Sequence, residues 1–110
     1  MVKDALARLG AAIKTIETAD SRKKAELLKL YASLKTEVEG LAKAHGEQAR
    51  SIAGFAEVAA HEATRAGKSP RLLELSVEGL RTSVQGFETS HPELSEAVNR
   101  LCLLLARMGI

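Results

Sequence analysis

The stretch EVAAHEATR, residues 57–65, holds the densest group of side chains that could do chemistry in this chain. Glu57 and His61 are four residues apart, so a helix would place the carboxylate and the imidazole on one face, with Glu62 beside them. A metal site needs at least three protein ligands, and neither H-E-x-x-H nor a paired E-x-x-H motif is present. We interpret the stretch as an exposed helix face with local ion pairs. Metal binding by Glu57, His61 and Glu62 is the alternative.

The other reactive residue types have structural interpretations. His45 falls at a core position of a helical repeat, where a polar residue can set the register, and His91 precedes a proline in a turn. Cys102 lies in the apolar run LCLLLA and is expected to be a buried, unreactive thiol that cannot form an intramolecular disulfide. Four serines recur every seven residues with no histidine or acid placed to activate them: Ser69, Ser76, Ser83 and Ser90. We therefore expect no catalytic residue, no cofactor and no enzyme activity.

Composition and charge exclude several classes of partner. The net charge is +2 and acidic and basic residues are interleaved, which is typical of a solvated helix surface rather than a nucleic-acid interface. No apolar run approaches the ~20 residues that a membrane span needs, so stable membrane insertion is not expected. Charged residues interrupt the N-terminal apolar positions, so no secretory signal is predicted. With a single cysteine, these features favour a cytoplasmic location.

A chain of 110 residues is expected to be one domain. Aromatic residues are only 3% of the chain and tryptophan is absent, so the core must be aliphatic and rich in alanine. The first helix is predicted over residues 2–17, with Asp20 or Ser21 capping the next. This first helix is basic and amphipathic, which makes a weak membrane-peripheral adaptor a further alternative.

One long helix is predicted over residues 21–66, because apolar residues recur at heptad spacing from Leu27 onward. The central stretch AHGEQ places His45 and Gln48 at core positions on either side of Gly46. The helix could break there, or continue with a polar layer that sets its register. The unchanged heptad phase on both sides favours continuity. A stripe of alanines at one heptad position would allow a close helix contact: Ala42, Ala49, Ala56 and Ala63.

Two shorter helices follow, over residues 70–89 and 92–107. Ser69 and Pro70 suit the N-cap and the first helical position of the former. The motif TSHPEL separates the two, because the residue before a proline avoids the helical conformation, and Pro92 lies in the first turn of the latter. Ser90 and Glu93 fit an S-x-x-E capping box at the start of the last helix, with His91 as the turn residue before Pro92.

Beyond the first helix, five glycines fall within the predicted helices, where each costs roughly 1 kcal/mol relative to alanine. Tight helix contacts at these positions are the expected compensation. The five are Gly40, Gly46, Gly54, Gly79 and Gly86.

Together these elements predict an all-α fold: an antiparallel bundle of about four helices with one long central helix and coiled-coil-like packing. Apolar side chains surround the last helix almost completely, and such a band needs cover on several sides. We therefore expect a homodimer or a higher even homo-oligomer. The residues expected at its interface are Ala49, Ala56, Leu101, Leu104, Leu105 and Met108.

The C-terminal sequence FETSHPELSEAVNRLCLLLARMGI resembles the end of a bacterial family known as domain of unknown function 4404. The family pattern is F-E-x-S-H-P-x-L, an Asn-Arg step, and an apolar run that closes on M-G-I or L-G-I. The resemblance extends over the last half to two thirds of the chain, with IAGFAEVAAHEATR also similar. It implies a short, soluble, helical bacterial protein and supplies no activity or functional residue. The matching residues are Phe87, Glu88, Ser90, His91, Pro92, Leu94, Asn99, Arg100, Met108, Gly109 and Ile110.

With no reactive constellation and surplus apolar surface, the sequence favours a non-enzymatic, self-associating interaction or structural module. The metal-binding bundle and the membrane-peripheral adaptor remain the alternatives.

Overall fold

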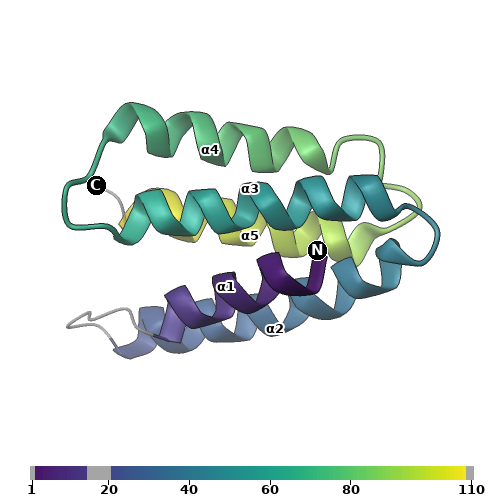
Figure 1. The fold of residues 1–110 in the computed structure, drawn as a ribbon, viewed down its shortest axis with the longest axis horizontal. Coiled ribbons are helices and arrows are strands. Elements are labelled where there is room, and N and C mark those ends of the chain that lie inside the picture. Colours follow the sequence, from purple (N-terminus) through teal and green to yellow (C-terminus); the bar gives the residue numbers. More distant parts are fainter. Residues whose placement is uncertain (1, 15–20, 109–110) are drawn as a thin grey trace.

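The computed structural model describes residues 2–14 and 21–108, and this part of the chain is all-α, as predicted. Successive helices run in opposite directions, with α4 on one side of the molecule and α1 and α2 on the other (Figure 1). The helices are α1 (Val2–Lys14), α2 (Ser21–Ala42), α3 (Gly46–Thr64), α4 (Pro70–Ser83) and α5 (Pro92–Met108).

Helix α3 is the centre of the bundle and contacts each of the other four helices. Its sequence explains this position, because alanine side chains let neighbouring backbones approach closely on several sides. The buried residues of α3 are Ala49, Ile52, Ala53, Ala56, Ala59, Ala60, Glu62 and Ala63.

The prediction of one continuous helix over residues 21–66 is wrong. Helix α2 ends at Ala42, and the backbone N–H groups of Ala44 and His45 both donate to the Leu41 carbonyl, at 3.2 and 2.8 Å. The chain then reverses and α3 begins at Gly46. His45 therefore occupies the N-cap position of α3, without a side-chain cap bond, instead of forming a buried polar layer.

One of the two expected heptad lines shifts by one residue across this reversal. Gln48, expected at a core position, is exposed, as is Phe55 seven residues later on the same heptad line. Ala49 and Ala56, one residue further along, are fully buried. One residue corresponds to about 100° of helix rotation. Helix α3 therefore buries its alanine stripe in place of the line of Gln48 and Phe55, whereas Ile52 and Ala59, on the other expected core line, are buried as well.

The ends of α4 and α5 follow the predicted turn chemistry in part. Ser69 is confirmed as the N-cap of α4, where its Oγ accepts a hydrogen bond from the Leu72 N–H at 3.3 Å, and Pro70 is the first helical residue. Helix α4 ends at Ser83 and not at residue 89, and Gly86 in the following turn has a φ of 97°. That left-handed conformation favours glycine.

The predicted capping box before α5 is not formed. Helix α5 begins at Pro92, so His91 and not Ser90 directly precedes the helix, and the Ser95 N–H donates to the His91 carbonyl at 3.2 Å. The Ser90 Oγ lies 3.0 Å from Nδ1 of the His91 ring instead. Glu93 lies in the first turn of α5.

Helix α1 uses its apolar face within the fold. Leu6, Leu9 and Ile13 are almost fully buried, and the helix contacts α2 and α3. The apolar face that the membrane-adaptor alternative would present to a lipid surface is thus packed in the core. Residues 15–17 of the expected helix and the candidate cap Asp20 lie outside the described residues.

The apolar band of α5 packs within the single chain. Leu101, Cys102 and Leu105 have no exposed surface and Leu104 is 4% exposed, whereas Leu103 is 55% exposed. Ala49 and Ala56 of α3 also belong to the hydrophobic core. Five residues expected at the interface are therefore buried inside the single chain: Ala49, Ala56, Leu101, Leu104 and Leu105. The side chain of Met108 lies outside the described part of the structure.

The helical glycines differ in what surrounds them. A Cβ on Gly79 would lie 2.5 Å from the Phe55 ring, which is the tight contact that was expected. At Gly40 and Gly54 an added Cβ would meet nothing within 4 Å, so packing within this chain does not explain either glycine.

Replacing Gly40 by alanine is expected to raise the free energy of unfolding by about 0.5–1 kcal/mol. The position is exposed in α2 and an alanine side chain would have open space there. Urea denaturation followed by circular dichroism measures the change. Gly10→Ala is the contrast, because its Cβ would lie 2.6 Å from the Tyr31 hydroxyl oxygen. Equal stabilisation by both substitutions would contradict the open space at Gly40 and the close contact at Gly10.

Candidate functional site

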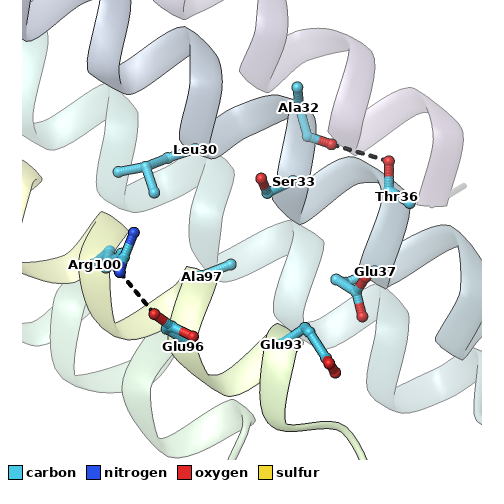
Figure 2. A pocket seen from close by; sticks show the side chains of 9 residues that line it. All are labelled: Leu30, Ala32, Ser33, Thr36, Glu37, Glu93, Glu96, Ala97 and Arg100. Carbon is cyan, nitrogen blue, oxygen red and sulfur yellow. Dashed lines mark hydrogen bonds and ion pairs between the residues drawn. The ribbon is translucent and has the colours of Figure 1, made fainter.

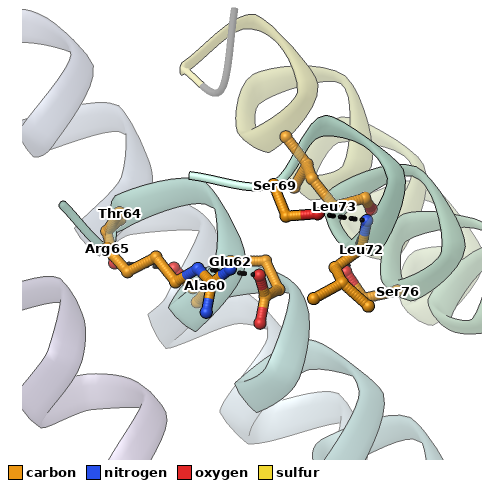
Figure 3. A network of polar contacts seen from close by, with 8 residues as sticks. All are labelled: Ala60, Glu62, Thr64, Arg65, Ser69, Leu72, Leu73 and Ser76. Carbon is orange, nitrogen blue, oxygen red and sulfur yellow. Dashed lines mark hydrogen bonds and ion pairs between the residues drawn. The ribbon is translucent and has the colours of Figure 1, made fainter. Parts of the chain in front are cut away.

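The candidate metal ligands do not form a common site. Arg8 Nε donates to the Glu57 carboxylate, which ties α1 to α3, and His61 is exposed. Arg65 Nε lies 3.1 Å from Glu62 Oε1, an ion pair near the start of α4 (Figure 3). Among residues 2–14 and 21–108, no group of three or more His, Cys, Asp or Glu side chains is arranged to hold a metal ion.

The described hydroxyl and thiol groups among the candidate nucleophiles have local structural partners. Ser76 Oγ donates to the Leu73 carbonyl at 3.0 Å, and Ser83 Oγ donates to the Leu80 carbonyl at 2.6 Å. The Cys102 thiol is buried and its Sγ lies 3.8 Å from the Val77 carbonyl oxygen. Burial raises the pKa of the Cys102 thiol, with a smaller opposing effect from Arg81. A thiol that is buried and protonated is a poor nucleophile.

An open groove of about 520 Å³ lies between α2 and α5 (Figure 2). Three carboxylates line it, and Glu96 is paired with Arg100 at 2.7 Å. The Thr36 hydroxyl donates to the Ala32 carbonyl at 3.1 Å, so it is satisfied within its own helix. The groove therefore combines acidic charge with small side chains, and nothing in this arrangement selects a particular ligand.

Three rings meet at the end of the bundle where the α2–α3 and α4–α5 connections lie. The His45 and His91 ring centroids are 5.6 and 5.5 Å from that of Phe87, and both rings stand edge-on to it. The two histidine centroids are 6.4 Å apart. Sequence spacing could not reveal this cluster, because His45 is more than 40 residues from Phe87 and His91 and meets them only through the fold. The contacts hold the two connections together.

The feature that sequence reasoning missed is an apolar surface on α3 and α4, here called the α3–α4 strip. Its four large side chains are each between 41% and 47% exposed. Phe55 lies over Gly79, and Phe55 and Leu75 line the same groove between the two helices, which has a volume of about 540 Å³. Val58 lies one turn after Phe55, and Leu72 lies one turn before Leu75. Because α3 and α4 are antiparallel, both residues lie toward the same end of the groove. The strip consists of Phe55, Val58, Leu72 and Leu75.

These features define a class of protein: a small all-helical bundle that presents apolar side chains across two adjacent helices. The chain belongs to the family described as domain of unknown function (DUF4404), which matches residues 55–110, just over half of its length. The whole α3–α4 strip lies within the matched residues. No curated protein and no solved structure matches the chain. Among the helices described, none is both long and apolar enough to cross a membrane.

Proposed function

We propose that this chain is a non-enzymatic protein-interaction module that self-associates through the α3–α4 strip. The observation that carries the proposal is the grouping of four large exposed apolar side chains on two adjacent helices. Single exposed apolar residues are ordinary on protein surfaces, but a contiguous apolar patch is typical of a protein–protein contact.

The energetics support a contact on this face. Fully burying one large aliphatic or aromatic side chain contributes about 1.5–3 kcal/mol, and the strip offers four that are little more than half buried. The polar residues at its edges, Ser51, Thr82 and Glu78, would provide the solvated rim that surrounds the apolar centre of most interfaces. The strip thus takes the place of the buried α5 residues as the basis for association.

Val58→Asp is expected to abolish self-association, because the substitution places a charge in the middle of the strip. Size-exclusion chromatography with light scattering at tens of micromolar protein measures the molar mass. The wild type is expected to elute as a dimer and Val58→Asp as a folded monomer. Circular dichroism shows whether the variant retains its helical content.

Leu103→Asp is the matched control. Leu103 is 55% exposed on α5, outside the α3–α4 strip, so the same substitution adds the same charge without touching the proposed interface. A wild type that stays monomeric at these concentrations would overturn self-association. Equal loss of dimer in both variants would place the contact elsewhere.

A further inference from the structure

We propose that a second copy of the chain occupies the strip, docked so that the two α3 helices run antiparallel. The two-fold axis that relates them lies on the exposed face of α3 at the level of Ala56, whose own side chain is buried in the core. This inference rests on the proposed self-association and assigns its geometry. It follows from three pairs of positions on the outer face of α3, each spaced symmetrically about that point.

The outermost pair carries opposite charges. Glu47 is exposed in the first turn of α3, and Arg65 follows its last turn with its side chain one-third exposed. Both lie nine residues from Ala56, so an antiparallel copy would place each Glu47 opposite the other chain's Arg65. The guanidinium has five N–H donors, and its pairing with Glu62 through Nε leaves the terminal nitrogens for a second carboxylate.

The innermost pair is complementary in size. Val58 is 47% exposed, and Gly54, one turn earlier, has open space where a side chain would be. Both lie two residues from Ala56, so each Val58 would enter the space above the other chain's Gly54. This gives Gly54 the close helix contact that packing within one chain does not provide.

A second copy explains these features better than an unrelated partner does. A two-fold interface uses the same patch on both chains and must be complementary to itself. Opposite charges at the two ends of α3 and a small residue beside a large one both satisfy that condition in the antiparallel orientation. In a parallel orientation the same residues would pair Glu47 with Glu47 and Val58 with Val58.

Disulfide trapping tests this geometry with the intermediate pair, Ser51 and His61, which are exposed and each five residues from Ala56. The full-length variant Ser51→Cys/His61→Cys is oxidised mildly and run on a non-reducing gel. We expect a cross-linked dimer, because the two positions would face each other across the interface within disulfide reach. Within one chain they are ~15 Å apart along the helix and cannot pair.

The single variants Ser51→Cys and His61→Cys are expected to stay uncross-linked, as is the wild type with its buried Cys102. Cross-linking of either single variant would indicate a parallel arrangement and overturn the inference. If no variant cross-links while Val58→Asp still turns a dimer into a monomer, the α3–α4 strip is the interface but the antiparallel pairing is wrong. A monomeric wild type overturns both proposals.

A charge reversal provides a second measurement. Glu47→Arg is expected to raise the dimer dissociation constant about tenfold by placing two arginines together at each end. Glu93→Arg is its control, since Glu93 is also an exposed first-turn glutamate but lies on α5, beside α2. An equal effect of the two reversals would contradict the proposed pairing of Glu47 with Arg65.

Discussion

Replacing Leu101 by alanine is expected to lower the free energy of unfolding by about 2–5 kcal/mol. The Leu101 side chain has no exposed surface and belongs to the core that all five helices share. Its removal forfeits the transfer free energy of the lost carbons and leaves a cavity that the packed neighbours only partly fill. Because a domain of this size is stable by only ~5–15 kcal/mol, a single truncation would remove a large share of the total.

Urea denaturation followed by circular dichroism measures this loss, with Leu103→Ala as the control. Leu103 is two residues along the same helix and 55% exposed, so its truncation should change the free energy of unfolding by less than about 0.5 kcal/mol. The comparison keeps the helix and the residue type constant and varies only burial. Similar losses at both positions would mean that the rotation of α5 assigned here is wrong.

Replacing Ala56 by leucine is expected to cost about 1–3 kcal/mol through overpacking. Ala56 is fully buried in α3, the helix that contacts all four others. A leucine there would have to displace a neighbouring helix or adopt a strained rotamer. A thermal melt followed by circular dichroism should show a clear fall in the melting temperature.

Ala32→Leu is the control for this experiment, because Ala32 is exposed in α2 and alanine and leucine are both good helix formers. It is expected to leave the melting temperature nearly unchanged. If Ala56→Leu melts like the wild type, the alanine face of α3 cannot be the close-packed centre of the bundle.

Local signals in the sequence predicted several elements correctly. The Ser69-Pro70 pair specified the start of α4, because a cap bond and a fixed φ depend only on residues within one turn. The amphipathic helix predicted at the start of the chain is α1, whose buried residues lie on one face. The C-terminal motif resembles the family whose model matches residues 55–110.

The heptad pattern was misleading at the α2–α3 connection. A continuous helix over residues 21–66 would be ~70 Å long, nearly twice the 38 Å longest dimension of the molecule. A chain of this size could not cover such a helix along its whole length. Reversal at Lys43–His45 packs the two halves against each other and buries apolar residues of both. The sequence around Gly46 does not reveal this stabilisation, because it depends on contacts between residues distant in the chain.

The sequence by itself determined that the chain is all-helical, that α4 begins at Pro70, that the core is aliphatic and to which family the chain belongs. Tertiary structure alone decided which apolar residues face solvent. Phe55 and Ala56 are adjacent, yet one is exposed and the other buried, because a helix turns by about 100° per residue and its rotation is set by the helices packed around it. The same rotation buries most of the apolar band of α5 and leaves the α3–α4 strip exposed.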